Sequence, residues 1–420
     1  MAENGKGILV IGGGMAGMTA ALEAAEAGVD AVLVEKESYL GGRVARMNQY
    51  FPKLCPPTCG LEINFRRIKS NPRITVVTGA GVEQITGAPG NYEVTVQIRP
   101  RFVTDACTLC DECARACPAE RDDDFNYGLS KTKAAYLPHS MAFPARYVID
   151  RAACEPDCTV CRDACTYGAV ELDQQPETRT FRVAAVVAAT GWRPYDAAKL
   201  DNLGYGKCAN VITNVIMERL AAPNGPTGGK ILRPSDGQEP RSVAFVQCAG
   251  SRDENHLPYC SAVCCTASLK QATYVRERYP EAKIKIFYID IRTPGRLEEF
   301  YAKVAERDIE LIKGKAAKVE EDPATGEVLV TAEDVMAGRK VTERVDLLVL
   351  ATGIVPNTGQ LPEAFDRDEF QFLTNPPGKT GLYGAGCARR PEEVSATVQD
   401  STGMALKAFQ CAVRSANHGG

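Results

Sequence analysis

The order of elements in the first 40 residues is the feature that most constrains the fold. An apolar run, Gly7 to Ile11, precedes an alanine-rich helical pattern that ends at Gly28, and a second apolar run, Ala31 to Val34, ends at the acid Glu35. Between the first run and the helical pattern stand three glycines in the GxGxxG spacing, Gly12, Gly14 and Gly17. Such glycines permit a tight turn and a close backbone approach to a pyrophosphate at the positive end of a helix, while the acid can accept hydrogen bonds from a ribose. The sequence therefore predicts a dinucleotide-binding α/β unit rather than an ordinary glycine-rich turn.

The cysteine content is the second unusual feature. The chain has 17 cysteines among 420 residues, and its 45% hydrophobic composition provides large cores that need no disulfide support. The sequence begins with an expected strand rather than a signal segment, and its most apolar stretch, Val183 to Ala189, is too short to span a bilayer. We therefore expect a cytoplasmic protein without a membrane span, in which reduced thiols bind metal or carry redox chemistry. The net charge of −4 excludes a nucleic-acid binder held by bulk charge.

Two cysteine runs lie between Arg101 and Gln174. The first has the bacterial ferredoxin pattern CxxCxxCxxxCP, and the second is CxxxCxxCxxxC. In two-cluster ferredoxins the fourth cysteine of each run ligates the other cluster. The spacing thus predicts one 4Fe-4S centre on Cys107, Cys110, Cys113 and Cys165, and another on Cys154, Cys158, Cys161 and Cys117. Zinc is the alternative, but its four-ligand sites do not explain a closely spaced trio with a trailing cysteine in each run.

A third group of cysteines follows a Pro/Gly-rich linker, Pro223 to Pro240. An apolar strand, Ser242 to Gln247, continues as QCAGSR without a second GxGxxG, so nicotinamide binding is doubtful. Instead, four cysteines follow within 18 residues: Cys248, Cys260, Cys264 and Cys265. This spacing favours metal ligation or a redox pair over buried thiols that only pack.

Several later segments resemble the two-dinucleotide-binding flavoproteins of the glutathione reductase and thioredoxin reductase superfamily. The doublet Gly41-Gly42-Arg43 resembles their second fingerprint, the segments Ala189-Thr190-Gly191 and Ala351-Thr352-Gly353 resemble their paired ATG segments, and GLYGAGCA resembles their last FAD motif. Cys387 stands where that motif usually has an aspartate. The resemblance favours FAD over NAD, with the expected cofactor residues Gly12, Gly14, Met15, Ala16, Gly17, Glu35, Lys36, Gly41, Gly42, Arg43, Ala189, Thr190, Gly191, Gly353, Gly386 and Cys387.

The ferredoxin runs interrupt the flavoprotein pattern. NYEVTVQIRP alternates like a strand before them, and TFRVAAVVAATG resumes the sheet after them. We expect an α/β, thioredoxin reductase-like flavoprotein with an inserted α+β two-cluster ferredoxin domain. The expected division is a first part of the FAD domain (1–100), the insert (101–178), a continuation of the FAD domain with the linker (179–236), a second Rossmann-like domain carrying the third cysteine group (237–345), and the last part of the FAD domain (346–420).

The chain as a whole resembles the family of heterodisulfide reductase A subunits. The resemblance is carried by FVQCAGSR, by YCSAVCCTASLKQA and by GCARRPEEVSATVQDSTGMALKA, which contains Cys387. It implies that Cys248, Cys260, Cys264 and Cys265 hold a third 4Fe-4S cluster, and that Lys270 lies near the flavin N5 and tunes the reduced states of the flavin by its charge. On its own residues, Lys270 could equally be a solvated helical lysine.

Within that family, the short length and the segment YFPKLCPPTCGLEINFRRIKSNPRI resemble the A subunits of quinone-interacting membrane-bound oxidoreductase complexes of sulfate reducers. This resemblance implies electron transfer between membrane menaquinol and adenylylsulfate reductase. The implied partners are a sister flavin/iron–sulfur subunit, together with a haem-bearing membrane subunit that would attach the chain to the inner face of the cytoplasmic membrane. Two alternatives remain open: the A subunit of a soluble electron-bifurcating heterodisulfide reductase, and a ferredoxin- or NAD(P)H-linked flavin disulfide or sulfur reductase.

The second alternative depends on Cys55 and Cys59. This CPPTC pair follows the glycine doublet and could form a redox disulfide that faces the flavin, although packing or a structural turn is the favoured interpretation. Among the three histidines, none is assigned to catalysis, and His139 is the one expected nearest to a cluster or a partner.

Overall fold

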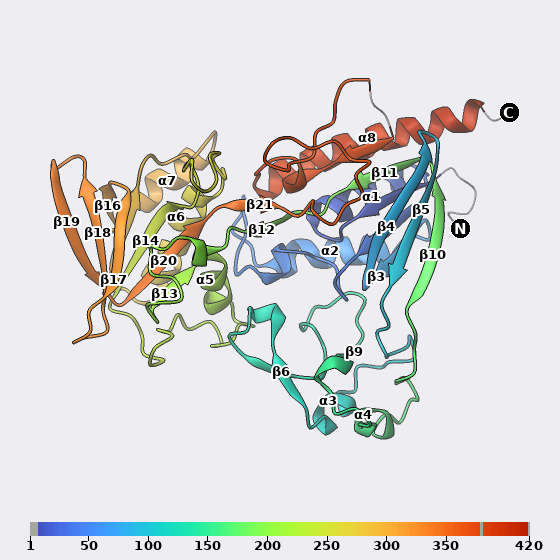
Figure 1. The fold of residues 1–420 in the computed structure, drawn as a ribbon, viewed down its shortest axis with the longest axis horizontal. Coiled ribbons are helices and arrows are strands. Elements are labelled where there is room, and N and C mark those ends of the chain that lie inside the picture. Colours follow the sequence, from blue (N-terminus) through green and yellow to red (C-terminus); the bar gives the residue numbers. More distant parts are fainter. Residues whose placement is uncertain (1–6, 379–380, 419–420) are drawn as a thin grey trace.

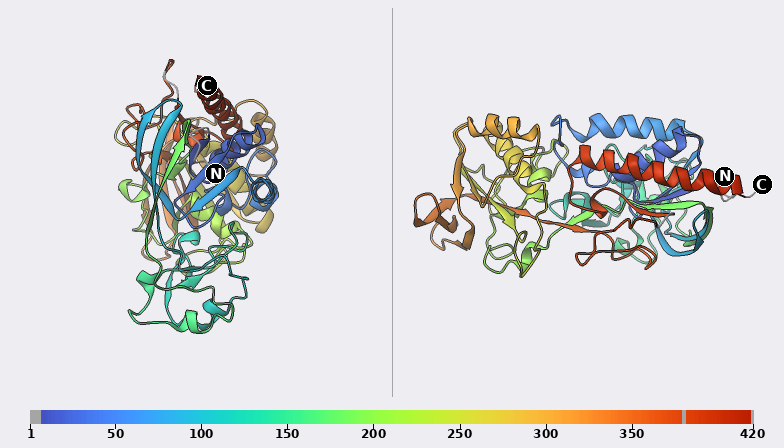
Figure 2. Two further views of the ribbon diagram at one scale, coloured as in Figure 1. Left: turned by 90° about the vertical axis from the view of Figure 1, so that its right-hand side faces the viewer. Right: turned by 90° about the horizontal axis from the view of Figure 1, so that it is seen from above.

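The molecule consists of two lobes and a smaller module that projects from one side of them (Figures 1 and 2). The computed structural model describes residues 7–378 and 381–418. The first lobe contains both ends of the described chain, and the second lobe is formed by the middle of the sequence. The module is the segment between two neighbouring strands of the first lobe.

The first lobe is built on a five-stranded parallel sheet whose order is β22-β11-β1-β2-β3. Its strands are β1 (Ile8–Ile11), β2 (Ala31–Glu35), β3 (Ile74–Thr78), β11 (Ala185–Ala188) and β22 (Leu382–Gly384). Its helices are α1 (Met15–Glu26), α2 (Pro57–Ser70) and α8 (Val394–His418). The alanine-rich face of α1 packs closely against the long α8, and both lie over the sheet. Residues 7–35 thus form the strand–helix–strand unit that the glycine spacing predicts.

The insert leaves the first lobe through an antiparallel meander. β4 (Ala80–Ala88), β5 (Asn91–Ile98) and β10 (Glu177–Val183) form one sheet, and the insert joins β5 to β10. Its short elements are α3 (Glu112–Ala116), β6 (Glu120–Asp122), β7 (Lys131–Lys133), β8 (Ala135–Tyr136), β9 (Val148–Ile149) and α4 (Val160–Asp163). Buried cysteines are part of its small core, together with Val103, Tyr147 and Ile149. Such a core is small, which suits a module stabilised by bound groups.

The second lobe has its own parallel sheet, in the order β13-β20-β14-β15-β16. Its strands are β13 (Val211–Thr213), β14 (Ser242–Ala249), β15 (Lys283–Tyr288), β16 (Glu310–Lys313) and β20 (Leu347–Thr352). Its helices are α5 (Asn214–Ala221), α6 (Cys264–Arg278) and α7 (Leu297–Ala305). An antiparallel sheet of β17 (Ala316–Glu321), β18 (Val328–Asp334) and β19 (Arg339–Val345) covers its other face.

Two expected domain boundaries are wrong. β13 lies in the segment expected to continue the FAD domain, and β20 lies in the segment expected to end it, yet both strands pair within the second sheet. The chain crosses between the lobes earlier than the expected boundary at 236/237 and later than the one at 345/346. The crossings are β12 (Trp192–Pro194) and β21 (Ile354–Pro356), which pair antiparallel and join the lobes (Figure 1). The other boundaries of the five-segment division stay predictions.

Candidate functional site

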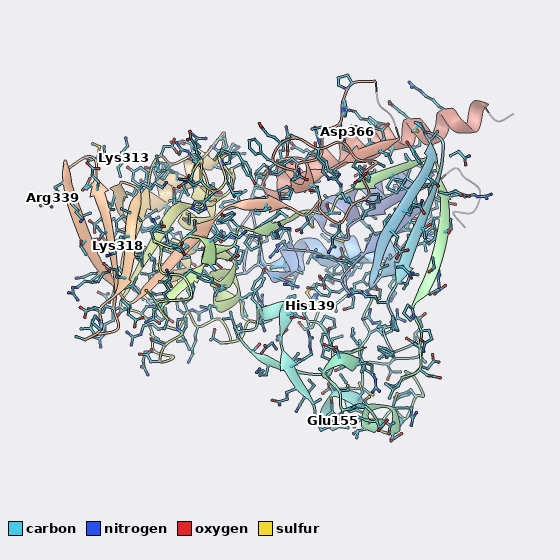
Figure 3. All side chains as sticks on the ribbon, in the orientation of Figure 1. His139, Glu155, Lys313, Lys318, Arg339 and Asp366 are labelled. Carbon is cyan, nitrogen blue, oxygen red and sulfur yellow. The ribbon has the colours of Figure 1, made fainter. Side chains whose placement is uncertain are left out.

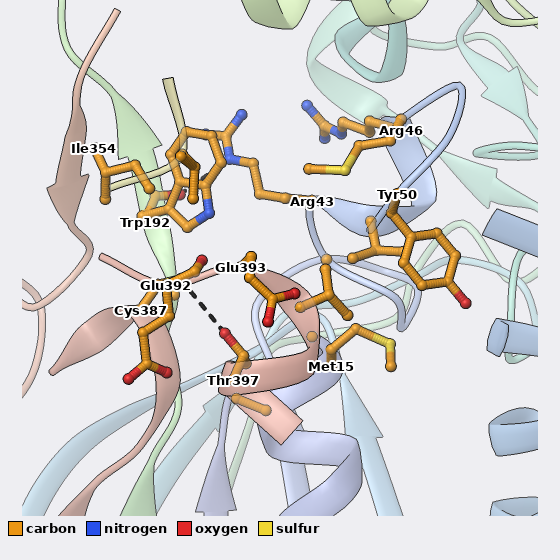
Figure 4. Close-up of a pocket in the computed structure, with 18 of the residues that line it drawn as sticks. Met15, Arg43, Arg46, Tyr50, Trp192, Ile354, Cys387, Glu392, Glu393 and Thr397 are labelled. Atoms are coloured by element: carbon orange, nitrogen blue, oxygen red, sulfur yellow. Dashed lines mark hydrogen bonds between the residues drawn. The ribbon is translucent and has the colours of Figure 1, made fainter. Parts of the chain in front are cut away.

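A cavity of about 270 Å³ opens where the parallel strands of the first lobe end (Figure 4). Its walls come from the β1–α1 turn, the segments that follow β2 and β11, and the beginning of α8. Residues of α5 and α6 close it from the second lobe. Ligands of open α/β sheets bind at this edge, outside the carboxyl ends of the strands.

The β1–α1 turn leaves the first amides of α1 open to the cavity. Gly12 has a φ of +109°, and a Cβ atom there would lie 2.4 Å from the carbonyl oxygen of Ala189. Gly14, the N-cap of α1, has free space beside it, since a Cβ atom there would meet only the Gly42 Cα atom, at 3.8 Å. The turn therefore forms a cradle in which backbone amides and the helix dipole can meet an anionic group.

Glu35 ends β2 at the wall of the same cavity. Its carboxylate accepts a backbone hydrogen bond from Gly13 and another from Glu37, the latter at 2.8 Å. Burial raises the pKa of Glu35, while these two amides act in the opposite direction. A carboxylate has about four lone-pair sites, so it can still accept hydrogen bonds from a ribose.

Most of the predicted cofactor residues line this one cavity. They are Gly12, Gly14, Met15, Ala16, Glu35, Lys36, Gly42, Arg43, Ala189, Thr190, Gly191 and Cys387. Four predicted residues lie behind the wall, namely Gly17, Gly41, Gly353 and Gly386. Gly17 allows α1 to pack against β1, since a Cβ atom there would lie 1.7 Å from the Gly12 carbonyl oxygen.

Unpaired polar atoms show that the cavity fits a polar ligand. Within the described ranges, Thr190 Oγ1, Gln271 Oε1 and Glu392 Oε2 are buried without a hydrogen-bond partner, and all three residues line the cavity. Buried polar atoms are nearly always paired in folded proteins, so these atoms are suited to contacts with a bound molecule. Together with the glycine cradle and Glu35, they fit FAD.

Cys387 lines the cavity, but its thiol is engaged within the protein. Its Sγ atom donates to the Glu392 carbonyl at 3.3 Å and lies 3.8 Å from Thr397 Oγ1 (Figure 4). Burial raises the pKa of Cys387, which keeps the thiol neutral. The Thr397 hydroxyl and the Glu393 side chain share this wall, where the family motif has its aspartate.

Lys270 reaches the cavity from α6 of the second lobe. Its side chain is only 5% exposed, its Nζ atom donates to the Gln49 carbonyl at 2.6 Å, and it lies 2.9 Å from Glu218 Oε1. The same carboxylate accepts hydrogen bonds from Gln271 Nε2 at 2.7 Å and from the Tyr274 hydroxyl at 3.3 Å. This network holds the Lys270 ammonium at the cavity wall, which excludes the solvated lysine considered above.

The insert contacts the cavity through arginine and aromatic side chains. Arg43 donates to the Tyr127 hydroxyl at 2.9 Å, and its guanidinium lies 5.0 Å from the Trp192 ring centroid. The fully buried Arg219 donates to Asn126 Oδ1 at 2.8 Å and lies over Phe125. The turn at 124–127 therefore contacts both lobes.

His139 lies in this contact layer rather than in a thiol cavity. Its ring stacks on Phe125, with the centroids 4.6 Å apart, and meets the edge of Tyr39, a cavity residue, at 4.8 Å. Burial, and then the charges of Arg219 and Arg46, lower the pKa of His139 to about 4. The imidazole is thus neutral at physiological pH.

Four thiols of the insert surround a small cavity of about 20 Å³. They are Cys107, Cys110 and Cys113 from the first run and Cys165 from the second. Burial, followed by the nearby Cys107 thiol, raises the pKa of Cys113 to about 12. The fold therefore brings together the set of four predicted for the first cluster; that they bind iron stays a prediction.

The second set of the insert is also close together. Burial, followed by the neighbouring thiols of Cys154 and Cys117, raises the pKa of Cys161. Burial is also the main cause of the raised pKa of Cys154, to which Cys117 and Cys158 contribute. The last cysteine of the first run thus lies among three cysteines of the second.

The third set lies at the carboxyl end of β14 and the first turn of α6. Burial, followed by the thiols of Cys248, Cys265 and Cys260, raises the pKa of Cys264 well above its usual range. The next residues of α6, Thr266 and Ala267, line the FAD-type cavity, so this set adjoins it. The raised pKa keeps the free thiols protonated, whereas metal coordination would deprotonate them, because metal ligands are thiolates.

Within residues 7–378 and 381–418, no three Cys, His, Asp or Glu side chains form a site for a single metal ion. What the three thiol sets bind stays a prediction.

Cys55 and Cys59 form a separate pair near the cavity mouth. Burial, followed by a side-chain hydrogen bond to Cys59, raises the pKa of Cys55. Both thiols are free, and neither lines the cavity, although Tyr50, which forms a β-bridge with Cys55, does. Both interpretations of the pair therefore remain open.

Sequence reasoning missed the residues that join the parts of the site. Glu218, Trp192, Tyr39 and Tyr127 belong to no glycine or cysteine motif, and Gln271 lies in YCSAVCCTASLKQA without being assigned a role there. The one available signal was Glu218, an acid in the apolar helical pattern NVIMERLA, where a charge requires a buried partner.

Comparisons with known proteins agree with this geometry. The model of the FAD dependent oxidoreductase family matches residues 7–56. The A subunit of the ferredoxin/F(420)H(2)-dependent CoB-CoM heterodisulfide reductase from Methanosarcina acetivorans is 38% identical over 96% of this chain and 53% of its own length. The iron-sulfur A subunit of CoB–CoM heterodisulfide reductase from Methanocaldococcus jannaschii is 37% identical over 96% of this chain and 64% of its own length. Over nearly its whole length, the chain is similar to the A subunits of heterodisulfide reductases. It spans between about half and two thirds of the length of these relatives.

Solved structures confirm the predicted fold. Thioredoxin reductase from T. acidophilum has a TM-score of 0.53 at 14% identity, covering 97% of this chain and 98% of that enzyme. Thioredoxin reductase from Lactococcus lactis has a TM-score of 0.54 at 12% identity, covering 97% of this chain and 99% of that enzyme. The chain thus has the two-dinucleotide-binding fold. The match at residues 7–56 and the relatives together indicate an oxidoreductase subunit. In the parts that the structure describes, we find no helix with the length and apolar character of a membrane span.

Proposed function

We propose that the chain is an electron-transfer subunit that binds FAD and three 4Fe-4S clusters within a heterodisulfide reductase-like complex. The observation that carries the proposal is that one cavity adjoins the third thiol set and also contacts the insert, which carries the other two sets. The insert, with two thiol sets, contacts it through Tyr127 and Arg43, and the third set adjoins it through α6. A bound FAD would exchange electrons in pairs or singly, and clusters would carry them singly.

The residues of the chain then have separate tasks. The β1–α1 cradle holds the pyrophosphate and Glu35 the ribose, as the family fingerprint implies. Arg43, stacked on Trp192, forms the side of the cavity next to the insert. Lys270, held by Glu218, places a positive charge where it favours the negative charge that a flavin gains on reduction.

The narrower role we propose is electron transfer between membrane menaquinol and adenylylsulfate reductase in dissimilatory sulfate reduction. It is supported by the resemblance of residues 50–74 to the A subunits of quinone-interacting complexes. The partners would be a sister flavin/iron–sulfur subunit, together with a haem-bearing membrane subunit that holds the chain at the cytoplasmic face of the membrane.

Anaerobic purification from native membranes tests both levels of the proposal. Three clusters require roughly twelve irons per chain, and one FAD is expected beside them. Far fewer irons, or rapid bleaching of the flavin by NADH, would contradict the electron-transfer role. Co-isolation with a membrane cytochrome or an adenylylsulfate reductase would support the sulfate-reduction role, whereas a soluble heterodisulfide reductase partner would replace it.

A second candidate function is a flavin-linked disulfide reductase, which the contact between Cys55 and Cys59 favours. Cys55→Ser tests it, because the variant should retain all cofactors. Unchanged electron transfer in that variant removes this candidate, and loss of activity with intact flavin and iron supports it.

A further inference from the structure

We propose that the outer tip of the insert, defined by Leu109, Val160, Tyr167, Glu155 and Asp157, is the docking surface for an electron-transfer protein with a basic rim. The inference rests on the proposed function, since it requires clusters in the insert. It adds where electrons enter or leave the chain and what kind of protein carries them.

Exposed apolar side chains mark the centre of the tip. Leu109, Val160 and Tyr167 have 40%, 41% and 56% of their surface exposed. Each is within two residues of a predicted cluster ligand: Leu109 precedes Cys110, Val160 precedes Cys161, and Tyr167 follows Cys165 by two positions. Apolar and aromatic side chains form the desolvated centres of protein interfaces.

Tyr167 connects the surface with the first thiol cavity. It lines the cavity enclosed by Cys107, Cys110, Cys113 and Cys165, although more than half of its surface is exposed. A protein that covers Tyr167 would therefore lie one side chain away from the proposed cluster. Because Tyr167 is already exposed, a partner could contact it without a rearrangement of the insert.

The tip lies away from both lobes. α3 and α4 lie in contact with each other at the far end of the insert, and Glu155 is at this end as well (Figures 1 and 3). The opposite end carries Phe125, Tyr127 and His139 against the cavity residues. The insert thus has an inner end that meets the FAD-type cavity and an outer end that is free for a partner.

The charge around the apolar centre is negative. Glu155 and Asp157 are exposed, and neither forms an ion pair with any residue that the structure describes. Asp111 and Glu112 share a single cation, Arg115. This excess of acids fits a partner whose redox centre is ringed by lysine or arginine, because opposite charges accelerate encounter and orient the docking.

A small, partly apolar patch of this kind is typical of short-lived electron-transfer contacts. Such interfaces bury less area than stable complexes, so rates rather than tight binding report on them. Charge reversal should act mainly on the association rate and should weaken with salt, whereas removal of the apolar centre should act at every ionic strength.

The test uses the chain loaded with its cofactors and reduced anaerobically, with excess reductant removed. Stopped-flow absorbance then follows electron transfer to cytochrome c, a basic probe protein, and to flavodoxin, an acidic one. For cytochrome c we expect Glu155→Lys combined with Asp157→Lys to lower the rate constant about tenfold at low salt, and much less at high salt. Val160→Ser combined with Tyr167→Ser should lower it several-fold at both salt concentrations.

Matched controls lie on the second lobe. Val335→Ser with Met336→Ser removes apolar side chains that are even more exposed, from the β18–β19 turn. Glu281→Lys with Glu306→Lys reverses two exposed acids near α6 and α7. These controls should keep the parental rates. In every variant the iron content, the cluster spectra and the flavin absorbance must equal those of the parent chain.

The outcomes separate the two levels of inference. Tip variants that behave like the controls while clusters and flavin are intact overturn the docking surface and leave the proposed function standing. Faster transfer to flavodoxin than to cytochrome c in the parent chain overturns the basic-rim partner. A chain without iron removes the proposed function, and the docking surface with it. A dimer that Tyr167→Ser dissociates shows instead that the tip pairs two copies of the chain.

Discussion

The two parallel sheets of this protein use the same strand–turn–helix arrangement for different chemistry. In the first lobe, β1 ends in a glycine turn, and the open end of α1 faces a cavity that fits FAD. In the second lobe, β14 ends at Cys248 and Ala249, and α6 begins with Cys264 and Cys265 at the corresponding place. We therefore expect the loop after the strand, and not the sheet, to decide between a dinucleotide and a cluster.

The comparison also explains why the second lobe has no glycine fingerprint. Its helix end points to thiols, and a helix amino terminus that favours anions suits thiolate ligands as well as a pyrophosphate. The second unit also supplies Lys270 to the cavity of the first. The two units consequently form one site, with the flavin expected from the first and a cluster and a charge from the second.

Gly12→Val should have the largest effect, because it breaks the first unit alone. The new side chain would collide with the Ala189 carbonyl at a φ of +109°. We expect more than about 100-fold weaker FAD binding, the effect of losing about 3 kcal/mol. The measurement is flavin absorbance per chain after purification.

The control for this variant is Gly28→Ala. Gly28 also has a positive φ, +94°, but a Cβ atom there meets nothing within 4 Å. The Gly28→Ala variant should lose only about 1 kcal/mol of stability and should retain the flavin. Full FAD occupancy in Gly12→Val would show that the β1–α1 turn is not the pyrophosphate cradle.

Cys264→Ser should break the second unit and leave the first intact. Because this thiol is fully buried among three others, the variant should lose about four of roughly twelve irons while FAD is retained. Iron analysis and electron paramagnetic resonance of the reduced chain measure the loss. The control is Cys208→Ser, which replaces a buried thiol outside every set and should change neither the iron content nor the FAD content. An unchanged iron count in Cys264→Ser would remove the third cluster.

Sequence reasoning predicted the β1–α1–β2 unit well, because it follows from contiguous residues. The meander around the insert and the first thiol set join residues far apart in the sequence. The structure brings these residues together as well, as the strand alternation and the ferredoxin pattern predict. The motifs also led to the fold that the solved structures share.

Contacts between residues far apart in the sequence could not be predicted in the same way. Glu218 meets Lys270 from a different helix, and Trp192 meets Arg43 across 149 positions. The lobe crossings at β12 and β21 were misplaced because β20 continues the same apolar pattern up to Thr352. A one-dimensional pattern shows that a strand is buried, but not in which of two sheets it pairs.

Lys270→Met should show how strongly the second unit acts on the first. Removing a buried positive charge beside the cavity should make flavin reduction harder, and a loss of about 1.4 to 2.8 kcal/mol would lower the two-electron midpoint potential by about 30 to 60 mV. Spectroelectrochemistry measures the shift, and Lys270→Arg should largely restore the potential. The unpaired Glu218 should also reduce stability, so the melting temperature is measured in parallel. A potential that is unchanged in Lys270→Met would place the ammonium too far from the flavin to act on it.

His139→Phe should have the smallest effect, and it tests the attachment of the insert to the first lobe. The pKa of His139 is about 4 in the folded chain, below the usual 6.5, so the folded state binds fewer protons than the unfolded state. Its contribution to stability is therefore complete above pH 6.5 and is lost as the pH falls toward 4. The loss of stability is on the order of 2 kcal/mol at pH 5. The phenylalanine of the variant should abolish this loss, because its ring can stack on Phe125 and does not titrate. Thermal melting at pH 8 and pH 5 should thus show a smaller acid destabilisation in His139→Phe than in the parent chain, with His256→Gln as the control. Equal acid sensitivity in all three proteins would show that protons enter elsewhere and that the layer between the insert and the cavity tolerates a charged ring.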